Sequence, residues 1–399
     1  MTKFPVNIVY LCANPGLDLD KMLGPKIHIQ AILRGLKNQN INPTLVAVQK
    51  SDSIQGYEEF EAVILPHRYL RGFVHRIIPY TGIVDSLRIF LKILTLNRTR
   101  HFDLIHERYT GLSWGGMLTA KCLRIPYILQ MVGPGIEEKE IQGNKIKGSK
   151  KAILLFHQKL MLNNQQGLII ISRKIADFIK TRRGWKIPNW QVIPDSADSN
   201  FEYNQQNIEV IRNKYDLDGY KVLIYSGSLY RWYGILQVIK AFKIVTDQIP
   251  KVKLLLIGNG DAINEIINYT IQNDIQDQVK IIPPISRPEL HNYLQLSDIA
   301  LAHYIKEHNY TGNTAKISEY LAASKVVVTT PNMNELVKDG YTGFISPSFS
   351  IEDYAKTIIR ALNCENKKII GENAHNLILK YYTWNHYIEK LLKIYKYTK

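Results

Sequence analysis

Short apolar runs alternate along this chain with longer segments in which apolar residues recur every three or four positions. The short runs are rich in Val, Ile, Leu and Tyr, and the longer segments, such as 30–37, have the spacing of amphipathic helices. Apolar strands that alternate with helices pair in parallel and are covered on both faces. The pattern therefore predicts an α/β fold with doubly wound parallel sheets.

The alternation occurs in two successive series. The first series of strands is predicted at 6–13, 44–48, 62–66, 103–108, 127–132, 167–172 and 190–194. A polar connector rich in Asn and Gln follows at 195–207, and a second series is predicted at 221–227, 252–258, 278–284, 298–304, 325–330 and 343–347. We therefore predict two Rossmann-like domains, at 1–197 and 208–373, which bind ligands where their carboxyl strand ends face a cleft.

Composition narrows the class of protein. The chain has 399 residues, of which 45% are hydrophobic and 22% charged, so it is globular and long enough for two cores. Cys12, Cys122 and Cys364 are far apart, which favours a reducing compartment and argues against a disulfide framework or a zinc site. The apolar run at 6–13 is too short for a secretory signal, and no stretch of about 20 uncharged apolar residues occurs. We predict a cytoplasmic protein.

The charge balance predicts an anionic partner, because 51 Lys and Arg residues stand against 35 Asp and Glu residues, a net charge of +16. Between His67 and Arg100 the basic residues are interleaved with bulky apolar ones, which is typical of a helix lying on an anionic membrane surface, here the inner face of the plasma membrane. The apolar side chains would be Phe73, Ile77, Leu87, Phe90 and Leu94, and the basic ones Arg71, Arg76, Arg88 and Lys92. A core-facing helix with a solvated basic side is the alternative. Nucleic acid is not a predicted partner, because no zinc finger, RNP-type motif or basic coiled region occurs.

The stretch from Thr311 to Ile345 has the pattern of a nucleotide-binding unit. It combines a glycine-containing loop, a helix that carries Glu319 and an apolar strand. Free backbone N–H groups at such a helix start favour an anion, and a carboxylate further along the helix can accept hydrogen bonds from ribose hydroxyls. The pattern predicts a site for a nucleoside diphosphate, with an ordinary αβ unit as the alternative.

Seven segments, taken in order, resemble the retaining glycosyltransferases of family 4, the glycosyl transferases group 1, which have the GT-B fold. They are GPKIHIQAILRGLKNQNINPTLVAV, DLIHERYTGLSWGG, QVIPDSADSNF, YSGSLYRWYGILQVIKAF, LLLIGNGD, YLQLSDIALAHY and SEYLAASKVVVTT. Each segment is weakly specific alone, but the ordered set covers nearly the whole chain. The resemblance implies two Rossmann-like domains facing a central cleft, with a C-terminal helix within 374–399 that crosses back to the first domain.

The resemblance also implies a reaction. A hexose would move from a UDP-, GDP- or dTDP-sugar to an acceptor hydroxyl, with no further cofactor and no metal. The leaving diphosphate would be stabilised by a helix amino terminus and basic side chains, and no Asp-x-Asp motif contradicts this. The acceptor would be a glycan, a lipid-linked or membrane-associated molecule or a small molecule, as in bacterial glycan or natural-product biosynthesis.

Position-by-position matching implies a donor site in the second domain. Its residues would be Gly227, Ser228, Gly258, Pro284, Ile285, Thr311, Gly312, Asn313, Thr314, Ala315 and Glu319. Glu319 matches the ribose-binding second acid of the family's Glu-x7-Glu signature. The first acid would fall at Thr311, which has no carboxylate, so the loop must contact the donor sugar in another way. Asn313 and Thr314 are also plausible as plain helix caps.

The diphosphate clamp and the catalytic residues also depart from the family. Ser228 and Tyr233 occupy the positions of its Arg and Lys, and each missing cation removes about 1.5–3 kcal/mol of charge-assisted bonding. Arg231 and Lys316 are the predicted replacements, although a surface lysine is the alternative for Lys316. Gln130, near the place of a catalytic His in the family, completes the predicted catalytic set.

Acceptor contacts are predicted in the first domain. The candidate residues are Gly24, Lys26, His28 and His106, with a structural position at a strand end as the alternative for His106. Three functions stay open from the sequence. They are an active glycosyltransferase, a catalytically weakened GT-B subunit that binds a partner or glycan, and a sugar-nucleotide epimerase of the same fold.

Overall fold

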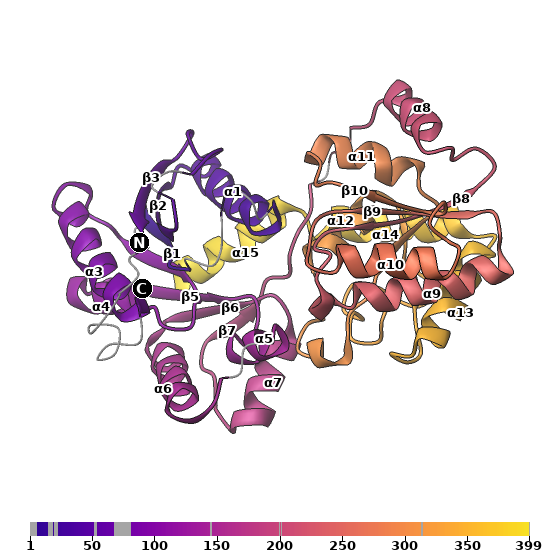
Figure 1. Cartoon of the computed structure of the whole chain (residues 1–399). Coiled ribbons are helices and arrows are strands. Elements are labelled where there is room, and N and C mark those ends of the chain that lie inside the picture. Colours follow the sequence, from indigo (N-terminus) through magenta and orange to yellow (C-terminus); the bar gives the residue numbers. More distant parts are fainter. Residues whose placement is uncertain are drawn as a thin grey trace. The chain divides into compact units, whose positions relative to one another are not determined.

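The computed structural model describes residues 6–14, 19, 23–51, 54–67, 81–143, 146–198, 200, 202–312 and 314–398. The chain divides into two compact units (Figure 1). Unit 1 comprises Met1–Ile193 together with Trp384–Lys399, and unit 2 comprises Pro194–Thr383. In the described ranges, no helix is long and apolar enough to cross a membrane.

Unit 1 is built on a seven-stranded sheet with the order β3-β2-β1-β4-β5-β6-β7. Every strand pair in it is parallel. The strands are β1 (Asn7–Cys12), β2 (Asn42–Gln49), β3 (Glu61–Pro66), β4 (Leu104–Arg108), β5 (Tyr127–Met131), β6 (Gly167–Ile170) and β7 (Trp190–Val192). Alternate residues of β1 enter different cores, since Val9 and Leu11 belong to one cluster and Ile8 and Tyr10 to another. Both faces of the sheet are therefore buried, as the unbroken apolar strands predict.

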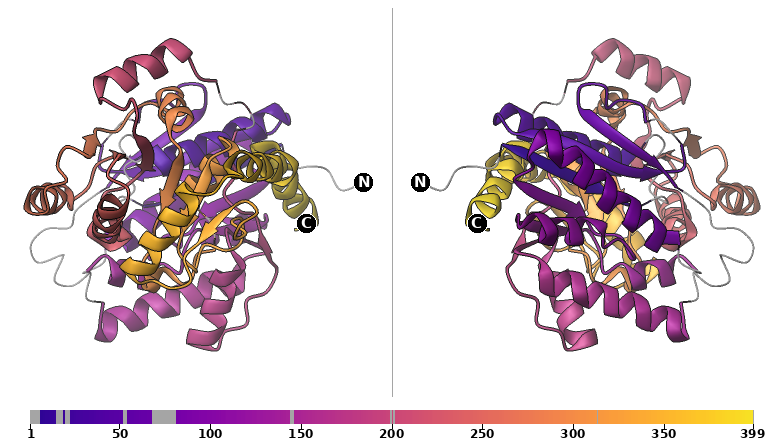
Figure 2. Two further views of the ribbon diagram at one scale, coloured as in Figure 1. Left: turned by 90° about the vertical axis from the view of Figure 1, so that its right-hand side faces the viewer. Right: turned by 90° about the vertical axis from the view of Figure 1, so that its left-hand side faces the viewer.

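Helices cover both faces of this sheet (Figure 2). The helices of unit 1 are α1 (Leu23–Asn38), α3 (Thr81–Arg100), α4 (Gly115–Leu123), α5 (Ile136–Ile141), α6 (Gly148–Asn164), α7 (Arg173–Arg183) and α15 (Trp384–Tyr397). One core takes side chains from α3, α4, α6 and α7, and the other from α1 and α15. The C-terminal helix α15 thus completes the core of unit 1, with Tyr387, Leu391 and Tyr395 buried against it.

Unit 2 repeats this architecture with a six-stranded parallel sheet in the order β10-β9-β8-β11-β12-β13. The strands are β8 (Lys221–Ser226), β9 (Val252–Ile257), β10 (Val279–Ile282), β11 (Ile299–Ala302), β12 (Val326–Thr329) and β13 (Gly343–Ile345). The helices are α8 (Gln205–Lys214), η1 (Arg231–Tyr233), α9 (Ile235–Gln248), α10 (Ile263–Gln272), α11 (Arg287–Leu296), η2 (Lys306–His308), α12 (Ala315–Ala322), α13 (Ile351–Leu362) and α14 (Lys367–Tyr381).

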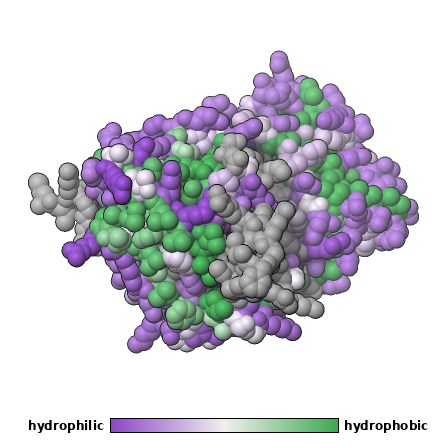
Figure 3. Space-filling view, turned by 60° about the vertical axis from the view of Figure 1, so that its left-hand side comes forward, coloured by the Kyte–Doolittle hydropathy of each residue, from purple (hydrophilic) through white to green (hydrophobic). Residues whose placement is uncertain are grey.

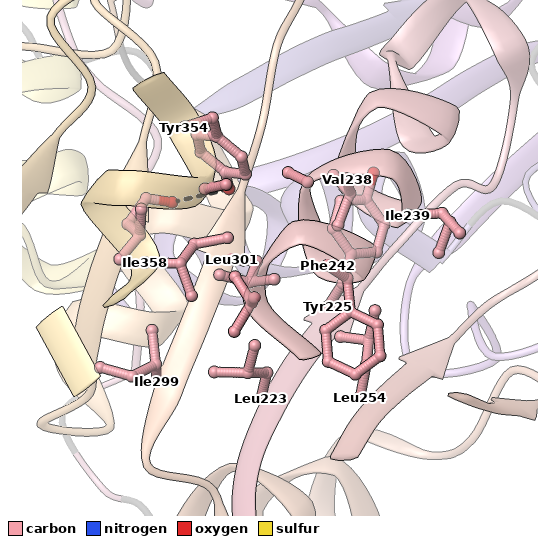
Figure 4. Packing of buried hydrophobic residues seen from close by; sticks show 14 of the residues in the cluster. Leu223, Tyr225, Val238, Ile239, Phe242, Leu254, Ile299, Leu301, Tyr354 and Ile358 are labelled. Carbon is pink, nitrogen blue, oxygen red and sulfur yellow. Dashed lines mark hydrogen bonds between the residues drawn. The ribbon is translucent and has the colours of Figure 1, made fainter. Parts of the chain in front are cut away.

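The two faces of the second sheet carry separate cores. Figure 4 shows one of them, in which Leu223, Tyr225 and Leu301 of the strands pack against Phe242 of α9 and Ile358 of α13. The other core contains the intervening strand residues together with side chains of α12 and α14. Both units are therefore doubly wound, and the predicted α/β fold is confirmed.

The structure places the boundaries between the units more exactly than the sequence does. The first crossing lies between Ile193 and Pro194, and the return lies between Thr383 and Trp384. Helix α14 covers the first part of the predicted segment 374–399 and stays in unit 2, so the segment that returns to unit 1 is α15.

Candidate active site

Two glycines bring the carboxyl ends of β8 and β9 into contact. Gly227 and Gly258 follow these strands with φ values of 135° and 151°, a region of backbone space that L side chains rarely adopt. A Cβ atom on Gly258 would lie 1.8 Å from the carbonyl oxygen of Gly227. Because ligands of open parallel sheets bind outside the carboxyl strand ends, a ligand can approach the backbone at Gly227, which is exposed and has no side chain.

Lys316 lies against this turn. Its Nζ atom is 3.6 Å from the centroid of the Tyr225 ring and 5.7 Å from that of Tyr304. A Cβ atom on Gly227 would lie 3.1 Å from the same Nζ. Burial lowers the pKa of Lys316 to about 7, and within the described residues no carboxylate offsets that burial. The ammonium group is held by aromatic faces, which makes it available to an anionic ligand.

The amino terminus of α12 presents Lys316. Thr314 is the N-cap in an extended conformation, and its side chain, instead of capping the helix, bonds to the Tyr304 hydroxyl at 2.7 Å. The predicted Ala315 is the first residue of the helix, whose first turn contains no acid. Its first backbone N–H groups have no intrahelical acceptor, and the helix dipole favours an anion there.

The loop before α12 carries no carboxylate of its own. Thr311 is buried, and its hydroxyl donates to the carbonyl oxygen of His308 at 3.0 Å. Gly312 packs on Glu335, because a Cβ atom at Gly312 would lie 2.5 Å from the Glu335 Oε1 atom. The predicted contact residue Asn313 lies outside the described residues.

Glu319 lies one turn beyond Lys316 on the same helix and is held by an arginine. Its Oε1 atom accepts a hydrogen bond from Arg287 Nε at 2.9 Å, and Arg287 Nη1 donates to Asp198 Oδ2 at 2.5 Å. The Glu319 side chain is 17% exposed, so its carboxylate is fixed but reachable. Such a carboxylate can accept hydrogen bonds from the hydroxyls of a ribose.

The remaining predicted donor residues line the neighbouring loops. Ser228 follows Gly227 and is half-buried, with its carbonyl oxygen accepting from the Tyr225 hydroxyl at 3.2 Å. Pro284 is exposed and Ile285 half-buried in the loop between β10 and α11, which leads directly to Arg287. The structure therefore places Lys316 against Gly227. Ile285 lies just before Arg287, the residue that binds Glu319.

Arg231 has other partners in this structure. Its Nε atom donates to Glu265 Oε1 on α10 at 2.5 Å, and its backbone N–H donates to Asp261 Oδ1 at 3.0 Å. A role for Arg231 at the diphosphate would require the ion pair with Glu265 to break. Lys316 is the predicted cation that the structure places against the glycine turn.

In unit 1 the structure gives two predicted site residues an internal position. Gln130 is fully buried, where it accepts from the Tyr10 hydroxyl at 3.0 Å and donates to the Tyr387 hydroxyl at 2.9 Å. His106 is also fully buried, with its Nδ1 atom 2.7 Å from the Tyr395 hydroxyl, and burial lowers its pKa to about 3. These contacts attach α15 to the sheet, and a catalytic Gln130 and an acceptor-binding His106 stay predictions.

The other predicted acceptor residues belong to α1. Gly24 is exposed and Lys26 is half-buried in its first turns. His28 is buried, with Nδ1 3.4 Å from Arg108 Nη1 and its ring edge-on to Trp384. Gly24 and Lys26 are open to solvent and stay predictions, whereas His28 faces the interior of unit 1.

Two further features belong to unit 2. A cavity of about 470 Å³ is lined by residues of α11, the end of α12 and α14, including His291 and His375, and lies at the opposite end of α12 from Lys316. In the part of the chain that the structure describes, no group of three His, Cys, Asp or Glu side chains could hold a metal ion.

Sequence reasoning missed the residues that support Lys316 and Glu319. Tyr304 and His303 directly follow β11, and Tyr225 lies near the end of β8. Their positions at carboxyl strand ends are the signal that could have indicated them. Arg287 had no such signal, because its pairing with Glu319 and Asp198 joins segments far apart in sequence.

Part of this chain matches a known protein family. Residues 207–378, which contain the strands and loops described above, match the family model Glycosyl transferases group 1. An uncharacterized glycosyltransferase of Methanocaldococcus jannaschii is 23% identical over 94% of each chain. The alpha-monoglucosyldiacylglycerol synthase of Streptococcus pneumoniae is 24% identical over 77% of this chain and 68% of the other.

Solved structures share the fold at lower identity. The Anabaena protein HepE, whose crystal structure is a complex with UDP and glucose, superposes with a TM-score of 0.73 at 14% identity over 97% of this chain and 98% of its own. At that identity the likeness shows the fold alone. The chain therefore has the GT-B fold, residues 207–378 match a glycosyl transferases group 1 domain, and the relatives support glycosyltransferase activity.

Proposed function

We propose that this protein is a retaining glycosyltransferase that moves a hexose from a nucleoside-diphosphate sugar to an acceptor hydroxyl. The observation that carries the proposal is Lys316, a cation held on Tyr225 and Tyr304 beside the glycine turn at the carboxyl end of β8. An ammonium group on a half-buried side chain, beside exposed backbone and a helix amino terminus, is suited to bind a diphosphate.

In the proposed mechanism unit 2 stabilises the leaving group. Lys316 and the amino terminus of α12 take up the negative charge that develops on the diphosphate as the sugar bond breaks. Glu319 accepts hydrogen bonds from the ribose and fixes the distance between the base and the phosphates. Lys316 and the amino terminus of α12 supply positive charge without a metal ion, so we expect transfer to persist in the presence of EDTA.

Titration with UDP, GDP and dTDP, followed by isothermal calorimetry, tests donor binding. An active enzyme binds one of these nucleotides, and a GT-B subunit that serves only as a partner-binding protein binds none. The epimerase alternative predicts that a free UDP-sugar changes its configuration without an acceptor. Retention is tested separately, by determining the anomeric configuration of the product with NMR.

Replacing Glu319 with alanine should weaken nucleotide binding by about 1–3 kcal/mol, because the ribose hydroxyls lose their acceptor. The affinity for the nucleoside should fall by the same amount as that for the nucleotide, since the lost contact is to the ribose. Calorimetry with both ligands measures this. An unchanged affinity would remove Glu319 from the ribose site.

The Glu319 variant needs a structural control, because Arg287 also loses a partner. Arg287 also pairs with Asp198 at 2.5 Å, a contact that the substitution of Glu319 does not itself remove. Replacing Asp198 with asparagine therefore perturbs the same arginine without removing the carboxylate on α12. If Asp198→Asn weakens nucleotide binding as strongly as Glu319→Ala, the loss reports the position of Arg287 and not a ribose contact.

We further propose that the acceptor is membrane-associated and that α3 lies on an anionic membrane surface. Leu87 and Leu91 on one face of α3 are 49% and 54% exposed, with Lys92 and Arg98 on the same helix. Apolar surface gathers on this side of unit 1 (Figure 3). Four residues of the predicted membrane segment, Arg71, Phe73, Arg76 and Ile77, lie outside the described residues.

Replacing both Leu87 and Leu91 with serine should lower binding to vesicles that contain anionic phospholipid by about 10-fold or more, because two apolar side chains no longer enter the lipid. Co-sedimentation with the vesicles measures this. The matched control replaces Ile267 and Ile271, exposed residues on α10 of unit 2, with serine. Equal losses in both variants, or no loss in the first, would contradict the assignment to α3.

A further inference from the structure

His303 is a buried histidine whose ring nitrogens lack partners. It is 1% exposed, and among the described residues neither Nδ1 nor Nε2 has a hydrogen-bond partner. Its ring stands edge-on to that of Tyr354, with the two ring centroids 4.9 Å apart. The Tyr354 hydroxyl does not bond to His303, because it donates to the Val328 carbonyl oxygen at 3.1 Å. Buried polar atoms without a protein partner are rare and costly, so a ligand or a water molecule is expected to satisfy them.

The ring lies at the amino terminus of α9. His303 Nδ1 is 2.8 Å from the place that a Cβ atom of Gly234 would occupy, so only a glycine allows this approach. Gly234 is the N-cap of α9, with a φ of 82°, and the described side chains provide no cap for this helix. Its first turn also contains no acid. In this helix of 14 residues the first intrahelical bonds run from the N–H groups of Gln237 and Val238 to the Gly234 carbonyl oxygen. The backbone N–H groups before them lie at the helix start beside a buried imidazole.

The electrostatics of this place favour an anion. Burial, and secondarily the charge of Lys316, lower the pKa of His303 to about 3, so its imidazole is neutral at pH 7. A neutral imidazole donates from one ring nitrogen and accepts at the other. Because a helix amino terminus lies beside the ring and the charge of Lys316 acts on it, an oxygen anion is the ligand that matches the donating N–H.

We propose that His303 and the amino terminus of α9 form a phosphate subsite that, together with Lys316, binds a nucleoside diphosphate. The inference rests on the proposed function and adds a binding residue to that site. His303 would donate a hydrogen bond from a ring nitrogen to a phosphate oxygen, and Gly234 is required because any side chain there would displace the ring. The subsite offers neutral hydrogen-bond donors where the chain has Ser228 and Tyr233 in place of cations.

The test compares three ligands that differ in their phosphates. Uridine, UMP and UDP, or the corresponding guanosine or thymidine series, are titrated into the full-length protein and into His303→Phe by calorimetry. Phenylalanine keeps an aromatic ring against Tyr354 and removes both nitrogens. We expect the affinity for the diphosphate to fall by about 10- to 100-fold and that for the nucleoside to stay unchanged.

A matched control and a stability measurement separate binding from packing. His375→Phe changes another histidine of unit 2, whose Nδ1 lies 2.6 Å from the Ala322 carbonyl oxygen at the far end of α12, and should leave all three affinities unchanged. His303→Phe should melt at the wild-type temperature or above, because it removes unsatisfied buried nitrogens. A large fall in melting temperature together with equal losses for all three ligands would assign His303 a packing role and overturn the proposal.

The outcomes for the site and for the proposed function are distinct. If the wild-type protein binds the diphosphate and His303→Phe binds it equally well, the subsite is overturned while nucleotide binding stands. If the wild-type protein binds none of the diphosphates, the proposed function fails and the subsite fails with it. In the wild-type protein, inorganic pyrophosphate should also shift the imidazole NMR resonances of His303, and unchanged resonances at saturating nucleoside diphosphate would overturn the proposal without any variant.

Discussion

Replacing Lys316 with methionine should lower the affinity for the nucleotide sugar by about 2–3 kcal/mol, or about 30- to 150-fold, and the transfer rate by at least as much. Methionine keeps an unbranched apolar stem against Tyr225 and Tyr304 but removes the charge. Calorimetry with the nucleotide sugar and steady-state kinetics measure the two losses. A larger loss in rate than in affinity would show that the charge matters more in the transition state than in the ground state.

The pKa of Lys316 also predicts that the affinity for the nucleotide sugar depends on pH. Burial lowers the pKa of Lys316 to about 7, so the free protein loses this charge as the pH rises through about 7. A bound diphosphate favours the charged form, and above that pKa binding must take up a proton. The affinity of the wild-type protein should therefore fall by up to about 10-fold per pH unit between about pH 7 and 9. Lys316→Arg stays charged in this range, so its affinity should vary less with pH.

Lys325 provides the matched control for Lys316. Burial also lowers its pKa, to about 8, but its Nζ atom donates to the carbonyl oxygens of Gln295 and Ser297 at 3.1 and 3.2 Å. It follows the opposite end of α12. Lys325→Met should destabilise unit 2 without changing the affinity for the nucleotide sugar. If both methionine variants lose affinity equally, the loss reflects general destabilisation and Lys316 is not a diphosphate ligand.

The strands of both sheets were predictable because each is apolar on two faces. The segment 252–258, for instance, corresponds to β9 at Val252–Ile257, in which Leu254 and Leu256 enter one core and Leu255 and Ile257 the other. Such burial leaves an unbroken apolar run that a surface helix does not have. The order of the strands does not follow from these runs alone, because it depends on which strands pair in space.

The point at which the chain returns to unit 1 was less predictable. Helical spacing continues from α14 into α15, and no glycine or proline separates them at Tyr382–Thr383. The break is made by tertiary contacts, because Thr383 pairs with Ala197 and the Ala197 N–H donates to the Tyr382 carbonyl oxygen at 3.1 Å. The sequence around either residue does not indicate a pairing between residues so far apart in the chain.

In the candidate site, too, some positions are indicated by the local sequence and others depend on tertiary contacts. The position of Lys316 and Glu319 near the start of one helix was predictable, because the helix start and both charged residues lie within one short segment. The internal contacts of Gln130 and His106 were not predictable, because they are made with Tyr387 and Tyr395 at the far end of the chain. His303 was overlooked because burial of both ring nitrogens is a property of the packed sheet and not of the sequence around it.

Replacing Gly258 with alanine should have the largest effect on stability, lowering the free energy of unfolding by at least about 3 kcal/mol. Its φ of 151° is strained for any L side chain, and the added Cβ would lie 1.8 Å from the carbonyl oxygen of Gly227. That neighbour is backbone within a hydrogen-bonded turn, with the Gly227 N–H on the Ile257 carbonyl oxygen at 2.8 Å, so it cannot rotate away. Urea denaturation measures the loss.

Gly219→Ala is the control that separates backbone strain from the steric clash. Gly219 has a φ of 76°, but a Cβ atom there would meet nothing within 4 Å, so alanine should cost only about 1 kcal/mol. If the two variants are equally stable, the strand ends do not approach as the structure has them. If Gly258→Ala retains a folded fraction at low temperature, that fraction should still bind nucleotide poorly. The clash can be relieved only by moving Gly227, and Lys316 is positioned against Gly227.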